Sequence, residues 1–393
     1  MKHTAAILLV IAATPAAARE IVVAPGADAQ ERLQEALIEA APGDTVRIAA
    51  GRYELTDGLS LDVPKVTVRG AGADQTILSF KGQLGAGEGL LVTSDDVVLR
   101  DFAVEDSRGD GIKSKGADRI VYKALRVEWT GGPKETNGAY GVYPVESRHV
   151  LIDGVTVKGA SDAGIYVGQS EDIIVRNSTA TGNVAGIEIE NSNRADVTGN
   201  TATHNTGGIL VFDLPNLPKM GGGDVRVVGN TVTDNDTPNF APKGNIVASV
   251  RKGTGVLVMA NDGVEVSGNT FGGNATGNVM VVSYRNAFTD TTYNPLPRRI
   301  TVRGNTHGRA GFAPEMPGGA QLVAAFGGAI PPVLWDGTGS GVAVTDGAVL
   351  NLNLKPGAPI ETAQPAPADL SKAVGWASRG PVVLPAAMEV AAR

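Results

Sequence analysis

Residues 160–213 repeat one short pattern three times, and this repeat constrains the fold more than any other feature. Each copy begins with a glycine and an alternating apolar segment, passes a polar turn, and continues into two more short alternating segments. Landmarks such as Gly154, Asn177 and Asn200 lie 23 residues apart. A fixed period of this length is typical of a solenoid, in which each repeat forms one turn and stacking buries a continuous core.

Short hydrophobic segments that match the second strand of this repeat recur nine times between residues 65 and 305. They are KVTVRG (65–70), DVVLRD (96–101), RIVYKA (119–124), HVLIDG (149–154), DIIVRN (172–177), ADVTGN (195–200), VRVVGN (225–230), VEVSGN (264–269) and ITVRGN (300–305). The last five end on asparagine, and a second set comprises Asn183, Asn205, Asn235 and Asn274. Stacked asparagine side chains can hydrogen-bond along a coil, so we interpret both sets as structural. The sequence predicts an all-β solenoid of nine or more turns.

The first residues have the composition of a secretory signal peptide. Lys2 is followed by an apolar run, and small residues at 16–18 form a cleavage site. The run is too short to span a bilayer. We therefore predict that residues 1–18 are removed by cleavage near Ala18 and that the protein is periplasmic or secreted.

Residues 19–345 are predicted to form the solenoid domain, with a helix covering its first turn. In the segment DAQERLQEALIEA, hydrophobic residues recur at helical spacing, and Asp28 stands at the N-cap position. A helix at about 28–41 would shield the first strand from pairing with another molecule. The Pro- and Ala-rich residues 346–393 are predicted to form a C-terminal cap or a strap along the coil, with a mobile end.

Composition narrows the possible partners. The chain has no cysteine, which excludes disulfides, thiolate metal sites and cysteine nucleophiles. The formal net charge is −7, and removal of Lys2 with the leader makes it −8. This balance disfavours nucleic acid and anionic membranes as partners, although a local basic patch could still bind a polyanion.

The repeat and its N-terminal helix resemble the right-handed parallel β-helix of the pectin-lyase-like superfamily over about residues 27–310. More narrowly, the strings NGAYGVYPV, DAGIYVGQS, GIEIENS and GGILVFDLPNLP, which span residues 137–218, resemble an exported family of parallel β-helix repeat proteins. The resemblance implies a right-handed, single-stranded coil. It implies no firmly assigned activity, and it implies a cytochrome-like exported protein as a partner.

Four insertions interrupt the regular spacing, at about residues 131–138, 214–224, 234–253 and 284–299. All four fall just before or just after the strand that begins with glycine. Insertions that gather on one face of a solenoid usually mark its binding face. We therefore predict that they rise as walls beside the outward face of the glycine strands.

Alignment of the glycine strands predicts which side chains face outward. Strand alternation points six apolar residues into the core: Ile112, Val142, Ile165, Ile187, Ile209 and Val256. One outward column then reads Lys113, Tyr143, Tyr166, Glu188, Leu210 and Leu257, and the next reads Lys115, Val145, Gly168, Glu190, Phe212 and Met259. Adjacent turns are about 4.8 Å apart, so neighbours within a column can act together.

The lyase and epimerase chemistry of this scaffold removes the proton beside a uronate carboxylate and needs a cation, a base and an acid. Tyr143 or Tyr166 could act as the base if Lys113 lowered its pKa, because an unperturbed phenol has a pKa of about 10. Glu188 and His204 complete the candidate catalytic set. The candidate substrate-binding residues are Lys115, Glu190, Phe212 and Asp213. The competing interpretation is ordinary packing of an outward tyrosine column.

Two further patterns bear on the chemistry. The carboxylates of Asp162, Glu188 and Glu190 could supply some of the roughly six to eight oxygens of a Ca²⁺ site, or could form a solvated face. The string YGVYP is similar to the YG-x-x-PH string of alginate C5-epimerases, but Val145 stands where their histidine would be. This departure puts the epimerase mechanism in doubt.

We therefore expect an exported protein that binds or modifies an acidic polysaccharide, with a lyase- or epimerase-like cleft over the strands that carry Tyr143 and Glu188. The alternative is a non-catalytic interaction platform that acts with a cytochrome-like partner. Soft-metal handling is a third interpretation, which the absence of cysteine and the scattered histidines and methionines disfavour.

Overall fold

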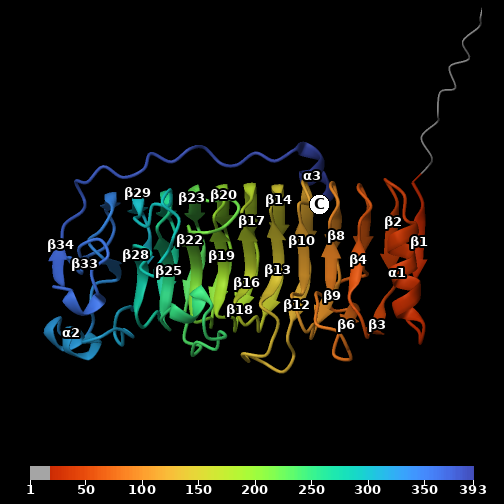
Figure 1. Cartoon of the computed structure of the whole chain (residues 1–393), viewed down its shortest axis with the longest axis horizontal. Helices are drawn as coiled ribbons and strands as arrows, with labels where there is room; N and C mark the ends of the chain where they lie inside the picture. The colour runs from red at the N-terminus through yellow and green to blue at the C-terminus, as the bar shows by residue number, and fades with distance from the viewer. Residues whose placement is uncertain (1–17) are drawn as a thin grey trace, which may run out of the picture.

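The computed structural model describes residues 18–393, which form a parallel β-helix with three long sheets (Figure 1). Successive strands of each sheet come from successive turns, as the repeat predicts. The predicted signal peptide lies outside the described residues except for Ala18. Within residues 18–393, no helix is long and apolar enough to cross a membrane.

Sheet A has 12 strands and contains the predicted second strand of each turn. In spatial order they are β1 (Glu20–Val23), β2 (Thr45–Ile48), β5 (Thr67–Arg69), β8 (Val98–Arg100), β11 (Ile120–Lys123), β14 (Arg148–Asp153), β17 (Glu171–Arg176), β20 (Asn193–Thr198), β23 (Gly223–Val228), β26 (Asp262–Ser267), β29 (Arg298–Arg303) and β32 (Ser340–Val344).

Sheet B has 10 short strands that follow those of sheet A. They are β3 (Gly51–Glu54), β6 (Thr76–Ser79), β9 (Ala103–Glu105), β12 (Arg126–Glu128), β15 (Thr156–Lys158), β18 (Thr179–Thr181), β21 (Thr201–Thr203), β24 (Thr231–Thr233), β27 (Thr270–Gly272) and β30 (Thr306–His307).

Sheet C has 12 strands and carries the candidate face. They are β4 (Leu59–Leu61), β7 (Leu90–Val92), β10 (Ile112–Lys115), β13 (Tyr140–Val145), β16 (Ala163–Gly168), β19 (Ala185–Glu190), β22 (Gly207–Phe212), β25 (Thr254–Met259), β28 (Gly277–Val282), β31 (Val333–Trp335), β33 (Val349–Asn351) and β34 (Ala366–Ala368). The strand β34 closes the sheet by pairing antiparallel with β33.

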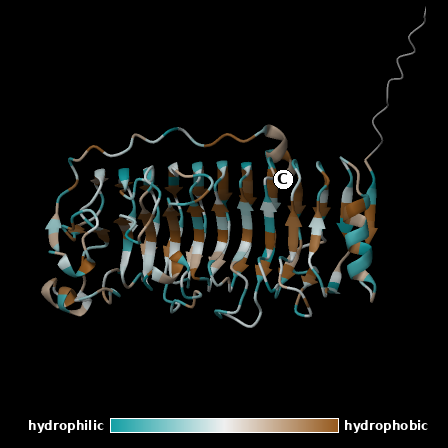
Figure 2. Ribbon diagram, viewed as in Figure 1, coloured by the Kyte–Doolittle hydropathy of each residue, from teal (hydrophilic) through white to brown (hydrophobic). Residues whose placement is uncertain are grey.

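One continuous apolar core runs through the coil, because each turn contributes inward-facing valine, isoleucine and leucine side chains. Hydrophobic residues recur on strand after strand along the coil (Figure 2). The helix α1 (Ala29–Glu39) covers the N-terminal end, as predicted, and buries Leu33 and Leu37. Asp28 precedes it, but its carboxylate pairs with Arg32 at 3.0 Å and makes no capping hydrogen bond.

Four stacked asparagines, the first three of them buried, form a ladder on one corner of the coil. Asn200, Asn230 and Asn269 each donate from Nδ2 to Oδ1 of the next asparagine, at 3.0, 2.9 and 2.9 Å. Asn305 ends the ladder by donating to Asp346 Oδ2 at 2.7 Å. The second predicted set also stacks, with distances of 3.0, 3.2 and 3.1 Å between successive side chains. Both sets therefore hold adjacent turns together.

Asn177 does not join the ladder, so the prediction that placed it there is wrong. The neighbouring residue, Ser178, occupies the ladder position in this turn. Because Val175 pairs with Val197, Ser178 lies beside Asn200 and its backbone N–H donates to Asn200 Oδ1 at 3.0 Å. Asn177 instead has a φ of 52°, in the left-handed region where Gly199 has a φ of 65°. Asparagine tolerates this conformation, which explains how it replaces a glycine there.

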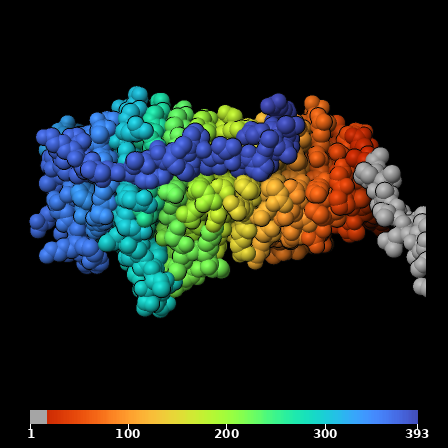
Figure 3. Space-filling model, turned by 90° about the horizontal axis from the view of Figure 1, so that it is seen from above, coloured from red at the N-terminus to blue at the C-terminus, as the bar shows by residue number. Residues whose placement is uncertain are grey.

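The C-terminal residues form a strap that runs back along sheet A (Figures 1 and 3). The last turns of the coil include α2 (Gly319–Ala325), η2 (Ile360–Thr362) and β34. The strap follows them and carries α3 (Ala386–Ala391) near its end. Met388 of α3 is 4% exposed and packs with Leu151 of β14. Arg176 and Glu389 form an ion pair at 2.8 Å. The end of the chain, predicted to be mobile, is therefore docked.

Candidate functional site

The outward face of sheet C has its side chains in the predicted register. Lys113 lies beside Tyr143, and Glu188 lies between Tyr166 and Leu210. The six residues predicted to point inward are fully buried. Strand alternation therefore predicts the two faces of this sheet correctly.

Three tyrosines pack against one another on this face. The ring centroids of Tyr140 and Tyr143 are 4.5 Å apart, those of Tyr140 and Tyr166 are 4.5 Å apart, and those of Tyr143 and Tyr166 are 4.9 Å apart. Tyr140 is absent from the predicted set. Tyr140 is the first residue of the YGVYP string, and this string is the sequence feature that could have identified it as a site residue.

Three carboxylates beside the tyrosines are almost completely buried, with exposed fractions of 6% for Asp162, 1% for Glu188 and 9% for Glu190. Burial raises the pKa of Asp162 and the pKa of Glu190 to about 7. Burial and the charges of the neighbouring carboxylates raise the pKa of Glu188 further above its usual value. Among residues 18–393, no atom is a hydrogen-bond partner for Glu188 Oε2. Both burial and the neighbouring charges favour the protonated form of Glu188.

Two of these carboxylates, those of Glu190 and Asp162, are held by neutral donors. The Tyr166 hydroxyl donates to Glu190 Oε1 at 2.7 Å, and Asn245 Nδ2 donates to Asp162 Oδ2 at 3.0 Å. Within the described residues, no three histidine, aspartate or glutamate side chains form a group that could hold a metal ion. The predicted calcium ligands Asp162, Glu188 and Glu190 do not form such a group.

The insertion at residues 234–253 lies over this cluster, and we call it the roof. It contains η1 (Ile246–Ser249), and its Val247 and Val250 are 2% and 4% exposed. Both valines belong to the apolar cluster that also contains Tyr166. The predicted wall is thus a cover, because its apolar side chains pack onto the outward column. Tyr166 and Glu188, both predicted as catalytic residues, are 4% and 1% exposed and are therefore inaccessible to a polymeric ligand.

The face is open on the N-terminal side of the roof, at what we call the tyrosine patch: Glu88, Asp110, Lys113, Tyr140 and Tyr143. Lys113 Nζ lies 3.0 Å from Glu88 Oε1, 3.7 Å from Asp110 Oδ2 and 4.9 Å from the centroid of the Tyr143 ring. The side chains of Lys113, Glu88 and Asp110 are 23%, 28% and 13% exposed. The patch therefore combines a cation, two carboxyl groups and an aromatic surface within reach of solvent.

Burial sets the protonation states of the tyrosine patch. It raises the pKa of Asp110 to about 6, although Lys113 opposes the shift. Burial also raises the pKa of Tyr143, and Lys113 again opposes it without reversing it. The predicted phenolate base is therefore not formed at neutral pH, because Lys113 is already held by two carboxylates. Tyr166 has a pKa raised well above its usual value for the same reason, burial beside acidic groups.

Glu88 and Asp110 were missed because the alignment covered strands and not the residues before them. Asp110 precedes Gly111, Glu88 precedes Gly89, and Tyr140 precedes Gly141. The residue before the glycine of each sheet C strand is thus a third position to align. Asp110 Oδ1 accepts a hydrogen bond from the Tyr140 backbone N–H at 3.2 Å, which connects two of these positions.

The remaining predicted site residues lie apart from the tyrosine patch. Phe212 is 1% exposed within the apolar cluster under the roof. Asp213 accepts two backbone hydrogen bonds, at 3.0 and 3.1 Å, from the insertion that follows it. The exposed His204 pairs through Nδ1 with Asp236 at 2.9 Å in a turn after sheet B. Lys115 is exposed on β10, beyond Lys113 in the next column.

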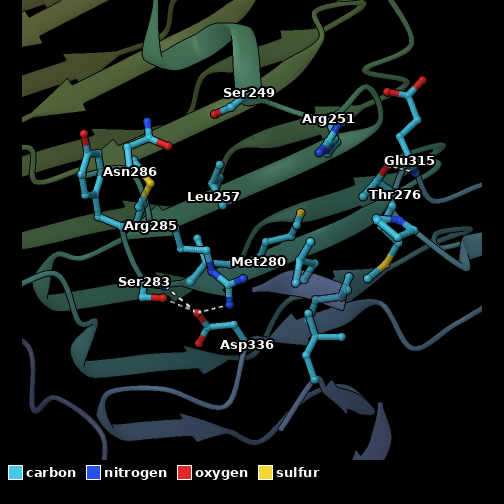
Figure 4. A pocket seen from close by; sticks show the side chains of 18 of the residues that line it. Ser249, Arg251, Leu257, Thr276, Met280, Ser283, Arg285, Asn286, Glu315 and Asp336 are labelled. Carbon is cyan, nitrogen blue, oxygen red and sulfur yellow. Dashed lines mark hydrogen bonds and ion pairs between the residues drawn. The ribbon is translucent and has the colours of Figure 1, made fainter. Parts of the chain in front are cut away.

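A pocket of about 290 Å³ lies on the C-terminal side of the roof (Figure 4). Its floor is the outward face of β25 and β28, and its walls come from the roof, from the segment after β28 and from the segment before α2. The roof thus separates two open regions on one face of sheet C.

Comparisons with known proteins identify the family. The family described as right-handed beta helix region matches residues 67–217 and 134–306. The chain belongs to this family of right-handed β-helices. Among curated protein sequences, none matches this β-helix significantly.

Solved structures share the fold of this β-helix at low sequence identity. The A-module of mannuronan C-5 epimerase AlgE4 from Azotobacter vinelandii is 14% identical, with a TM-score of 0.54 and coverage of 83% of this chain and 94% of that one. The A-module of AlgE6 from the same organism is 16% identical, with a TM-score of 0.50 and coverage of 81% and 89%. At these identities the likeness establishes the right-handed parallel β-helix and its architecture.

Proposed function

We propose that this β-helix binds an acidic polysaccharide at the tyrosine patch and exchanges a proton with it. The observation that carries the proposal is the position of Lys113, whose amino group lies 4.9 Å from the centroid of a partly exposed Tyr143 ring and beside two carboxyl groups. Aromatic rings pack against the apolar faces of sugars, and charged groups bond to their hydroxyl and carboxylate oxygens.

The known proteins with this fold support carbohydrate as the ligand class. The two similar A-modules are named as epimerases of mannuronan, an acidic polysaccharide. The YGVYP string at residues 140–144 adds to this support, because its two tyrosines are the aromatic residues of the patch. An accessible histidine is missing from the string, so the proton must be carried by other groups.

Three residues supply the groups that proton abstraction beside a uronate carboxylate requires. Lys113 neutralises the substrate carboxylate, and Asp110, with a pKa of about 6, is the base. In β-elimination Asp110 takes the proton from C5, the electron pair forms the C4–C5 double bond, and the C4–O bond breaks. The neutral Tyr143 hydroxyl then protonates the leaving oxygen. In epimerisation the Tyr143 hydroxyl instead donates its proton to C5 from the opposite face, after which Asp110 releases its proton to solvent and Tyr143 regains one.

Glu88 is the competitor that an acidic ligand must displace. Its carboxylate accepts a hydrogen bond from Lys113 Nζ at 3.0 Å. Burial raises the pKa of Glu88, but the hydrogen bond and the charge of Lys113 contribute to an overall lowering of that pKa. Lys113 therefore has no surplus positive charge in the free protein. Binding of a uronate exchanges one carboxylate for another at the same ammonium group.

The test is isothermal titration calorimetry with a panel of oligosaccharides: mannuronate, galacturonate and neutral hexose oligomers. We expect a uronate to bind, Tyr143→Leu to weaken binding about tenfold through loss of stacking, and Lys113→Gln to remove the preference over neutral sugars. Lys158→Gln on sheet B removes an exposed charge far from the patch and is the matched control. Absence of binding to every uronate would overturn the proposal.

A second assay separates binding from turnover. Elimination creates an unsaturated uronate that absorbs ultraviolet light, and epimerisation exchanges the C5 proton with D₂O. Asp110→Asn should abolish either signal while retaining binding. Binding without either signal would leave a carbohydrate-binding protein and remove the catalytic part of the proposal.

Export is part of the proposal, because the predicted signal peptide would deliver the protein to the periplasm or outside the cell. The comparisons give no support to a cytochrome-like partner. A non-catalytic platform is therefore kept only as an outcome of the binding test.

A further inference from the structure

We infer that the pocket on the C-terminal side of the roof is a second binding site, and that its ligand is an aliphatic monocarboxylate such as a medium-chain fatty acid. The pocket and the tyrosine patch share no residue, and the roof lies between them. The inference therefore stands independently of the proposed polysaccharide site.

The pocket is apolar over its floor and most of its walls. Its apolar lining consists of Ile246, Leu257, Met259, Met280, Val282, Met316, Pro317, Leu334, Leu352 and Ile360. Met280 lies beside Leu257 in one outward column, and Val282 lies beside Met259 in the next. These two columns form the floor. Exposure of apolar surface to water is unfavourable, so an apolar ligand that covers this surface binds favourably.

Three of these side chains are methionines, and they come from β25, β28 and the segment before α2. Their sulfur atoms are spread along the pocket and do not converge on one point (Figure 4). A soft metal ion would need them to converge. Flexible thioethers instead suit a pocket that adapts to a flexible chain.

The charges at the rim select the head group. Arg251 is exposed at the roof side of the pocket, and its guanidinium makes no ion pair or hydrogen bond with any residue between 18 and 393. Glu315, on the same rim, is held by Lys252 through an ion pair at 3.5 Å and a backbone hydrogen bond at 3.0 Å. The surplus charge at the mouth is therefore the positive charge of Arg251.

The opposite wall is polar but already saturated. Asp336 is 1% exposed and accepts hydrogen bonds from the backbone N–H and the hydroxyl of Ser283, both at 2.7 Å, and from Thr338. Arg285 lies 3.7 Å from the same carboxylate (Figure 4). This wall offers no free carboxylate that would repel an anion, and it leaves Arg251 as the partner of the head group.

The size of the pocket limits the ligand. The volume of about 290 Å³ is about twice the roughly 150 Å³ of an engineered apolar cavity that binds benzene, a ligand of about six carbons. A chain of about ten carbons therefore fits, with its carboxylate at Arg251. A sugar would leave its hydroxyl groups against apolar side chains, which is unfavourable.

Calorimetric titration of the full-length mature protein with decanoate tests the inference, with decanol, butyrate and decyltrimethylammonium as comparison ligands. We expect decanoate to bind at least about tenfold more tightly than each of the others, because decanol and decyltrimethylammonium lack a carboxylate for Arg251, and butyrate lacks the chain that covers the apolar floor. Weak binding of decanoate, or equal binding of decanol, would overturn the inference.

Two variants test whether the ligand binds in this pocket. Arg251→Gln should reduce decanoate affinity to that of decanol, and Met280→Phe should block the pocket and weaken both. Because Met280 faces outward and is partly exposed, the larger ring does not disturb the core. Lys81→Gln removes another exposed cation and should change nothing. Retained decanoate binding in Met280→Phe, or its displacement by an oligosaccharide, would rule out this pocket as a fatty-acid site.

Discussion

The Tyr166 hydroxyl donates a 2.7 Å hydrogen bond to Glu190 one turn further along the coil, and both side chains are buried under the roof. The ring of Tyr166 can lie in this position only because residue 168 is a glycine, whose absent Cβ would stand 2.4 Å from the ring. Tyr166, predicted from the sequence as a catalytic residue, and Glu190, predicted as a substrate-binding residue, are thus part of the packing between sheet and roof.

The buried carboxylates predict a stability that falls as pH rises. Glutamate and aspartate titrate at about 4 in the unfolded chain, whereas the pKa of Asp162 and that of Glu190 are raised to about 7 in the folded protein. The folded state therefore binds more protons at these two sites, and the stability that they contribute is full below pH 4 and is lost as pH rises through 7. We expect the melting temperature, followed by circular dichroism, to fall between pH 5 and 8.

Glu188→Gln should make that fall smaller, because the amide cannot ionise. Glu265→Gln is the matched control, because Glu265 is also buried. Burial raises the pKa of Glu265, but hydrogen bonds, including those from Arg303, outweigh this effect and lower the pKa overall. Its charge stabilises the fold above pH 4, so this variant should lose stability at pH 8 and keep the slope. A pH-independent wild type would contradict the assignment.

The asparagine ladder predicts losses of different size at two adjacent positions of the same corner. Asn200→Ala removes the hydrogen bonds to Asn230 and to the Val175 carbonyl and should cost about 1–3 kcal/mol in chemical denaturation. Asn177→Gly should cost less than Asn200→Ala, because glycine suits its positive φ and the change removes a single hydrogen bond, from Nδ2 to Asp153 Oδ1 at 3.2 Å. Equal losses would show that Asn177 belongs to the ladder after all.

The strap should stabilise the coil through its last helix. Met388→Ala removes a side chain that is 4% exposed and should lower the free energy of unfolding by about 2 kcal/mol. Val390→Ala, on the same helix but 63% exposed, should have little effect. Protease susceptibility of the strap provides a second measurement, and an undiminished resistance in Met388→Ala would argue against docking through this residue.

Glu88→Gln should improve the binding of uronates. The amide cannot neutralise Lys113, so the ammonium group becomes available to the ligand carboxylate. Affinity for uronate oligomers should rise about tenfold, since a charge-assisted hydrogen bond contributes about 1.5–3 kcal/mol, and affinity for neutral oligomers should not change. A loss of uronate affinity would mean that Glu88 itself contacts the sugar.

Much of the candidate face was predictable, because side chains of a strand alternate strictly and successive turns stack in register. Lys113 and Tyr143 are adjacent for that reason alone. Asp110 and Glu88 escaped prediction because they precede strands, where alternation does not apply. Whether an insertion forms a wall or a cover depends on its own apolar residues, such as Val247 and Val250, finding partners on the sheet.

The sequence by itself determined the coil, its cap helix and the inward and outward faces, because these follow from local periodicity and from stacking of like turns. The tertiary structure decided which outward residues reach solvent. The roof brings residues 234–253 over Tyr166 and Glu188, far from them in sequence, and the free energy of covering that apolar surface is a property of the packed molecule. Which outward side chains of sheet C a ligand can reach is therefore evident only from the tertiary structure.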